Sequence, residues 1–125
     1  MLRYLLSNAF PTALMRRKIM VSPISLEMMR RLLTDHYFVS VWGHDNTLSL
    51  ASLVLGIDVT PLNRRDVVML DAENYPTVRG ERFTRVLILS PDLPQGFRPE
   101  SSEVIIAEQI SRWFPLLLDF AAADE

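Results

Sequence analysis

The chain has 125 residues, 49% of them apolar, with 13 basic against 15 acidic residues and no cysteine. A chain of this length can bury a core of its own, whereas disulfides and thiolate metal sites are excluded. The near balance of charge argues against a bulk electrostatic attraction to DNA or RNA. The apolar run at the start is too short for a signal peptide or a membrane span, and no repeat or linker divides the chain. We expect one domain over residues 1–125 in a reducing cytoplasm, with no membrane association and no DNA partner.

The first part of the chain is predicted to alternate strands and a helix. Residues 2–6 and 15–21 are predicted strands, because their apolar runs end at polar or turn-prone residues. Ser25 is placed to cap a helix in which apolar side chains recur at helical spacing. Residues 37–42 are rich in β-branched and aromatic side chains, which indicates a strand buried on at least one face.

A second helix is predicted over residues 48–55. Its side chains are apolar nearly all round, so we expect it to be deeply buried, and Gly56 is placed to end it. Residues 67–70 and 85–90 are two further predicted strands. The segment between them, 71–82, is polar and contains proline and glycine, which predicts an exposed hairpin or loop.

The C-terminal part is predicted to contain a turn, a helix and a strand. Residues 91–96 are the turn, and Ser101 or Ser102 can cap the helix. Residues 114–120 are the last strand, in which Pro115 favours an edge position. The predicted fold class is therefore α/β, a single domain in which helices flank a mixed β-sheet of about five to six strands.

The stretch Gly-His-Asp-Asn-Thr at residues 43–47 joins a predicted strand to a predicted helix. The first N–H groups of a helix are unpaired, and with the positive end of the helix dipole they bind phosphate or another anion. Gly43 has no side chain to hinder the approach of a ligand. His44 carries an imidazole, which suits proton transfer to a leaving oxygen. Ligands of open α/β sheets bind beyond the carboxyl ends of the strands, where this hinge lies.

The same residues also have a purely structural interpretation. Asp45, Asn46 or Thr47 can cap the helix, and His44 can satisfy a loop carbonyl group. The other histidine, His36, is interpreted as a surface or helix-end residue. The residues alone leave both interpretations of the hinge open.

Taken together, several segments resemble a known family. They are YLLSNAF at residues 4–10, VWGHDNT at 41–47, and LGI at 55–57 followed by Asn63 and Arg64. The set resembles the small viral anti-CRISPR ring nucleases and their cellular relatives in type III CRISPR systems. The order of elements matches over nearly the whole chain.

This resemblance implies a homodimer that binds cyclic tetra-adenylate across its interface and cleaves it without a metal or cofactor, thereby ending type III CRISPR signalling. A ribose 2′-hydroxyl attacks the adjacent phosphorus and gives linear di-adenylate with a 2′,3′-cyclic phosphate. His44 matches the family's proton donor to the departing 5′-oxygen. Asn8 matches a position whose side chain helps to hold the ligand. The remaining candidate ligand-binding residues are Ser7, Gly43, Asp45, Thr47, Gln95 and Arg98.

The sequence departs from the family at a third motif, in which an arginine contacts the scissile region and a glutamate organises the site. Asp92 stands at the arginine position and Gln95 at the glutamate position. The charge reversal costs on the order of a few kcal/mol beside a phosphate in a partly screened site. The arginine can be replaced in space by Arg98, Arg79 or Arg82, or the ligand can be a different cyclic oligonucleotide.

Two further hypotheses follow from this departure. The chain can bind a cyclic oligonucleotide without cleaving it and act as a sponge. Alternatively, it can be a protein-interaction subunit that presents aromatic anchors to a partner, with Phe97, Trp113 and Phe114 as candidates. Core packing explains these aromatic residues equally well.

Overall fold

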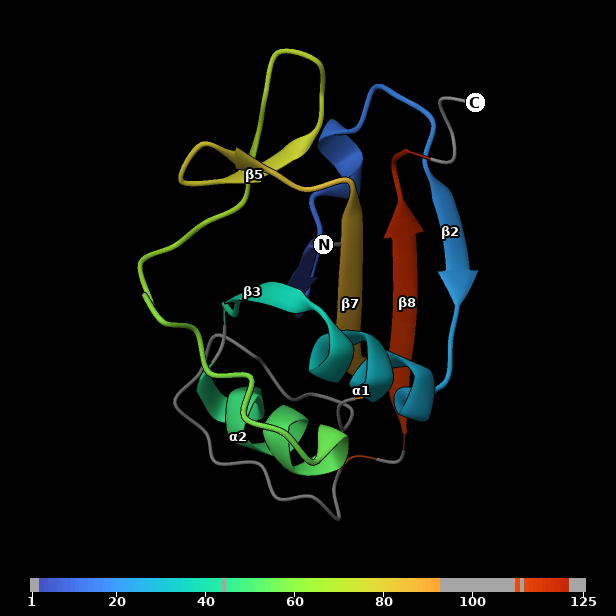
Figure 1. Ribbon diagram of the computed structural model, residues 1–125, viewed down its shortest axis with the longest axis vertical. Helices are drawn as coiled ribbons and strands as arrows, with labels where there is room; N and C mark the ends of the chain where they lie inside the picture. The colour runs from blue at the N-terminus through green and yellow to red at the C-terminus, as the bar shows by residue number, and fades with distance from the viewer. Residues whose placement is uncertain (1–2, 44, 93–109, 111, 122–125) are drawn as a thin grey trace.

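The computed structural model describes residues 3–43, 45–92, 110 and 112–121 (Figure 1). A five-stranded sheet forms the centre of this described part, together with a three-stranded sheet and two α-helices. The elements, in chain order, are β1 (Arg3–Ser7), the 3-10 helix η1 (Thr12–Leu14), β2 (Met20–Pro23), α1 (Leu26–Asp35), β3 (Tyr37–Val41), α2 (Asp45–Leu55), β4 (Met69–Leu70), β5 (Pro76–Val78), β6 (Glu81–Arg82), β7 (Arg85–Pro91) and β8 (Trp113–Asp119).

The large sheet is mixed, as predicted, and its strand order is β2-β8-β7-β1-β3. β1 pairs in parallel with both β3 and β7, whereas β8 is antiparallel to β7 and to β2. The carboxyl ends of β1, β3 and β7 therefore meet at one edge of the sheet, and β8 begins at the same edge. This edge, called the carboxyl edge below, is where ligands bind in many α/β folds.

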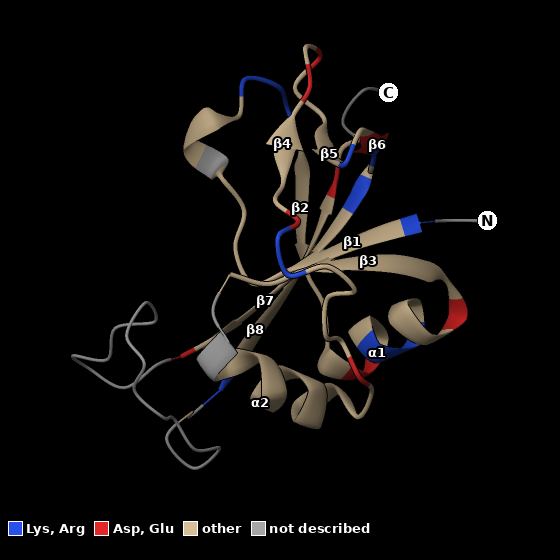
Figure 2. Cartoon of the chain, turned by 90° about the vertical axis from the view of Figure 1, so that its left-hand side faces the viewer, with Lys and Arg blue, Asp and Glu red and all other residues tan. Residues whose placement is uncertain are grey.

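The two faces of the large sheet are covered differently. Figure 2 shows both helices on one side of the sheet and the three-stranded sheet on the other. Alternation along β1 follows this division, because Tyr4 and Leu6 pack in the cluster with the helices while Leu5 packs with Val78 and Phe83 of the hairpin region. In the described part, the flanking helices that the sequence predicted thus cover one face only, and the small sheet covers the other.

Helix α1 begins as predicted. Ser25 is its N-cap, and the Ser25 Oγ accepts a hydrogen bond from the Met28 N–H at 3.0 Å. Met29 and Leu33 are buried. At the other end, the His36 ring lies against Tyr4 with ring centroids 5.5 Å apart, which confirms that His36 is a helix-end residue.

Helix α2 is not deeply buried all round, contrary to the prediction. Leu48 and Leu55 are buried, but Leu53 is 69% exposed and Val54 36% exposed. Only one side of this helix packs against the sheet and α1, so an apolar sequence does not by itself place every side chain in the core. Gly56 ends the helix as predicted, with a positive φ of 73°.

The predicted strand at residues 15–21 is wrong over most of its length, since β2 begins at Met20 and runs to Pro23. Before it, the main chain turns toward the small sheet, where Asn74 accepts a hydrogen bond from the Arg16 N–H at 2.6 Å and donates one to the Leu14 carbonyl at 3.3 Å. The Arg17 guanidinium lies 3.7 Å from the centre of the Tyr75 ring. These contacts hold the segment in place outside a sheet.

The polar segment 71–82 is a hairpin, as predicted, but not a fully exposed one. Its turn residues Arg79 and Gly80 both have positive φ, 49° and 82°, which fits the two-residue turn that joins β5 to β6. Pro76 and Val78 are buried against the large sheet. The hairpin therefore contributes to the hydrophobic core on this face of the large sheet.

Strand β8 is not at the edge, contrary to the inference from Pro115. It lies between β2 and β7, and β2 is the edge strand. The Pro115 carbonyl accepts a hydrogen bond from the Ile24 N–H at 3.2 Å, so the nitrogen of Pro115 also faces the β2 side, where pairing ends at Pro23. The proline therefore removes no hydrogen bond from the pairing with β7. The predicted helix after Ser101 or Ser102 lies outside the described residues.

Candidate functional site

The carboxyl edge brings together the two motifs that the sequence singled out. Ser7, the last residue of β1, is in register with Val41 of β3 and with Ile88 of β7. Asn8 follows β1 directly, and Gly43 is the second residue after β3. The Gly43 N–H donates a hydrogen bond to Asn8 Oδ1 at 3.1 Å, across 35 residues of sequence. The early turn and the hinge thus form one structural unit.

Asn8 is also fixed from the β7 side. Its carbonyl oxygen accepts a hydrogen bond from Ser90 Oγ at 3.0 Å. Because Oδ1 accepts from the Gly43 N–H, the amide orientation follows and Nδ2 is its donor end. This Nδ2 group donates to none of the residues that the structure describes, and Asn8 is half-buried. A donor held by two neighbouring strands is available to an anion at this edge.

Gly43 is exposed and has room around it. A Cβ atom at this position would lie 3.7 Å from Asn8 Oδ1 and 3.9 Å from Asn8 Nδ2, which are ordinary van der Waals distances. Of the three glycines that the structure describes, Gly56 and Gly80 have positive φ and Gly43 does not. Neither packing nor backbone conformation within the described residues therefore demands glycine at position 43.

Ser7 and Thr47, two predicted ligand-binding residues, are buried. The Ser7 hydroxyl donates to the Ala9 carbonyl at 2.7 Å and shapes the turn after β1. The Thr47 Oγ1 accepts a hydrogen bond from the Trp42 indole N–H at 3.1 Å, which satisfies a buried donor. Both buried hydroxyl groups thus form hydrogen bonds that stabilise the turn after β1 and the hinge after β3.

The remaining predicted residues are described in part or not at all. Asp45 is the first residue of α2, so the helix begins two positions after Gly43 and its N-terminal N–H groups lie at the carboxyl edge. His44, Gln95 and Arg98 lie outside the described residues.

Arg79 and Arg82 do not approach this edge. Arg79 forms a two-point ion pair with the nearly buried Asp66, at 2.9 and 3.0 Å. Arg82 pairs with Asp71 at 2.7 Å on the outer side of the hairpin. The hairpin lies at the amino end of β7 and α2 near its carboxyl end (Figure 1). β7 has seven residues, which at ~3.3 Å each separate the two ends by about 20 Å. Neither arginine is placed to replace a cation at the position of Asp92.

A basic residue that the sequence analysis did not consider does lie there. The Asp92 N–H donates to the Arg112 carbonyl at 2.8 Å, and Arg112 Nε lies 3.8 Å from Asp92 Oδ2. The Arg112 guanidinium is 4.9 Å from the centre of the Phe114 ring. Only the register of β7 with β8 brings these residues together, so no local sequence signal points to Arg112.

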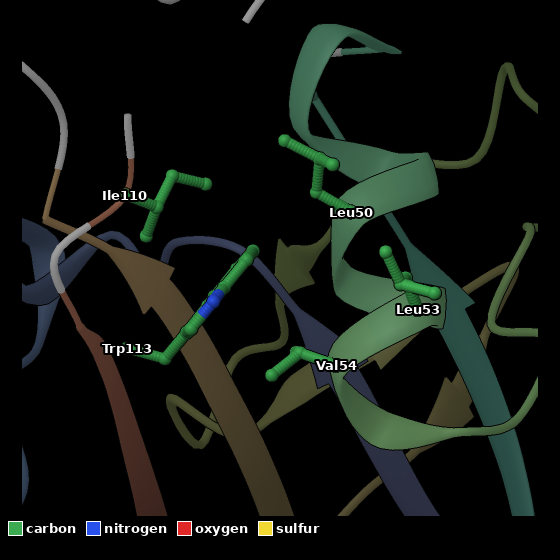
Figure 3. Close-up of a pocket in the computed structure, with 5 residues that line it drawn as sticks. All are labelled: Leu50, Leu53, Val54, Ile110 and Trp113. Atoms are coloured by element: carbon green, nitrogen blue, oxygen red, sulfur yellow. The ribbon is translucent and has the colours of Figure 1, made fainter. Parts of the chain in front are cut away.

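An apolar groove of about 230 Å³ opens beside the first residues of β8. Figure 3 shows side chains of α2 facing Ile110 and Trp113 across it. Its lining residues are Leu50, Leu53, Val54, Ile110 and Trp113. The described residues that line the groove carry neither an acid nor a base.

Charges are interspersed over the described part of the chain (Figure 2). Within that part, no three or more acidic or histidine side chains are grouped so as to hold a metal ion. None of its helices is long and apolar enough to cross a membrane. Searches of protein-family models and of curated protein sequences find no match to this chain.

Proposed function

We propose that this protein is a metal-independent ring nuclease that binds and cleaves cyclic tetra-adenylate in the cytoplasm of a prokaryotic cell or of an infected host. The observation that carries the proposal is the hydrogen bond from the Gly43 N–H to Asn8 Oδ1. It places the two motifs on which the family resemblance rests at one point of the carboxyl edge. The start of α2 at the same point adds unpaired N–H groups that favour a phosphate.

The proposed reaction uses the ligand's own nucleophile. The 2′-oxygen of one ribose attacks the adjacent phosphorus, the bond from phosphorus to the 5′-oxygen breaks, and the 2′-hydroxyl proton passes to solvent. His44 donates a proton to the departing 5′-oxygen. Asn8 Nδ2 and the first N–H groups of α2 stabilise the negative charge that develops on the phosphate oxygens. Two protomers would each cleave once, and two molecules of linear di-adenylate with a 2′,3′-cyclic phosphate would result.

The two histidines of the chain allow a matched test of this mechanism. His44→Gln is expected to lower the single-turnover rate by about 10²–10⁴-fold, the usual contribution of a general acid, with little change in ligand affinity. His36→Gln, at the end of α1, should cleave at the parent rate. Equal rates for the His44→Gln variant and the parent protein would rule out His44 as the proton donor.

A second candidate function is sequestration of a cyclic oligonucleotide without cleavage. It is favoured by Asp92, which places a carboxylate at the carboxyl edge. Tight binding together with an intact ring after long incubation at high protein concentration would support the sponge. A protein-interaction role, in which Trp113 lines the apolar groove and Phe114 is 40% exposed, would be favoured by a complete lack of affinity for cyclic oligoadenylates.

A further inference from the structure

We infer that Arg112 contacts a phosphate of the ligand and provides the cation of the proposed site from β8. This inference rests on the proposed function, and it names a residue outside both sequence motifs. Among the described residues, Arg112 is the one basic residue within two positions of a strand end at the carboxyl edge. An anionic ligand at this edge therefore has a single described guanidinium within its surroundings.

The main chain of Arg112 is held firmly in place. Pro91 and Trp113 form the last pair of the β7–β8 ladder, and the hydrogen bond from the Asp92 N–H to the Arg112 carbonyl extends it by one more pair. The Arg112 side chain lies over the Phe114 ring, two residues further along the same face of β8. Contact with an aromatic ring fixes the direction of the guanidinium without consuming its N–H donors.

A continuous row of contacts joins Arg112 to Asn8. Ser90 donates a hydrogen bond to the Asn8 carbonyl, and Ser90 is in register with Phe114. The guanidinium of Arg112 lies over that same Phe114 ring. Asn8 and Arg112 therefore lie on the two strands that neighbour β7, or directly beside them, at the carboxyl end of β7.

The ion pair with Asp92 is weak enough to yield to a phosphate. The Arg112 and Asp92 side chains are 71% and 45% exposed, and the nitrogen and oxygen atoms are 3.8 Å apart. Exposed pairs of this kind are screened by solvent and salt. Within the described part of the chain, the two terminal nitrogens of Arg112 donate no hydrogen bond, so a phosphate can accept two N–H bonds from the planar guanidinium. Asp92 then opposes binding through its charge.

The test is the affinity for cyclic tetra-adenylate, measured by calorimetry on the full chain in EDTA with catalysis blocked by His44→Gln. Arg112→Gln is expected to weaken binding by about 10–100-fold, the range for hydrogen bonds to a charged group. The affinity of the Arg112→Lys variant should lie between those of the parent and of Arg112→Gln, because lysine keeps the positive charge but lacks the planar pair of N–H donors of the guanidinium. Asp92→Asn should tighten binding several-fold. Arg31→Gln, an exposed position on α1, is the matched control and should bind as the parent does.

The outcomes separate this inference from the proposed function. Tight binding by the parent that Arg112→Gln leaves unchanged would overturn the role of Arg112 alone. A parent protein that does not bind the ring would overturn both. Unaltered thermal unfolding of the Arg112→Gln variant is expected, since the residue is held in the ladder by its main chain, and this measurement excludes loss of folding as the cause of weaker binding.

Discussion

The Asn8 side chain performs two tasks with its two ends. Oδ1 accepts the hydrogen bond from the Gly43 N–H, and Nδ2 is the donor end of the same amide. The hydrogen bond at Oδ1 joins the turn after β1 to the hinge. The Nδ2 group donates to none of the described residues and can donate to a ligand. A single amide thus links the stability of the edge to its proposed chemistry, and the two roles can be separated by substitution.

Asn8→Asp is the substitution that separates them. A carboxylate still accepts the Gly43 N–H, so the free energy of unfolding should change by less than about 1 kcal/mol. The second oxygen now repels a phosphate where an N–H donor stood, so affinity for cyclic tetra-adenylate should fall by at least about tenfold. Chemical denaturation and ligand titration of the same preparation measure the two quantities. Retained affinity would show that Asn8 only holds the hinge.

At the scale of single elements, α2 divides into a packed side and an open side. Leu55 is 1% exposed, whereas Leu53 is 69% exposed and lines the apolar groove. Truncation of a buried leucine leaves a cavity, while truncation of an exposed one does not.

We therefore expect Leu55→Ala to lower the free energy of unfolding by about 2–5 kcal/mol, and Leu53→Ala to change it by no more than about 0.5 kcal/mol. The two positions carry the same residue in the same helix, so each is the control for the other. Equal losses in urea denaturation would mean that Leu53 is covered in the folded protein.

The hairpin element carries a pH-dependent contact. The main-chain N–H of Tyr75 lowers the pKa of the Asp71 carboxyl, and the Arg82 guanidinium lowers it further. A carboxyl whose folded pKa lies below its unfolded value stabilises the protein above that unfolded value, about 3.9. This stability is lost as the pH falls through the folded pKa.

Asp71→Asn should therefore destabilise the protein at neutral pH and flatten the decline of stability on acidification. The measurement is the unfolding midpoint of the parent and of the Asp71→Asn variant from pH 7 down to pH 3. The Asp58→Asn variant is measured over the same range for comparison. The Asp58 carboxyl also has a lowered pKa, because of its bonds to Thr60, but lies outside the hairpin. An acid profile for the Asp71→Asn variant that parallels the parent would show that the bond to Tyr75 is not coupled to folding.

Features fixed by neighbouring residues could be predicted from the sequence, and those fixed by distant pairing could not. The Ser25 cap and the Gly56 helix end depend on a few adjacent residues, and both are found where predicted. The interior position of β8 and the partnership of Asp92 with Arg112 depend on which strands pair. The edge position predicted from Pro115 is wrong for this reason, since its missing N–H faces a point where the neighbouring strand β2 has already ended.

The candidate site shows the same division. Gly43 and Asn8 were predicted from the two motifs, and the structure brings them into hydrogen-bond contact. Thr47 belongs to the same motif, yet its hydroxyl serves the buried Trp42 indole. A motif in sequence does not reveal which of its side chains face inward, because that depends on the direction in which the helix leaves the sheet.

At the scale of the whole molecule, three layers position the proposed site. The helices cover one face of the large sheet, the hairpin covers the other, and the carboxyl edge collects Asn8, Gly43 and Arg112 between them. A symmetric tetranucleotide ring would span two such edges, so we propose that the active form is a two-fold homodimer. The site would then be complete only when both copies are present.

The measurement that tests the central claim most directly is product analysis in EDTA. The purified protein is incubated with radiolabelled cyclic tetra-adenylate, and the products are resolved by chromatography beside a His44→Gln sample. We predict conversion of the ring to linear di-adenylate that carries a 2′,3′-cyclic phosphate, with His44→Gln slower by orders of magnitude. A ring that remains intact at protein concentrations in excess of the ligand would contradict the account.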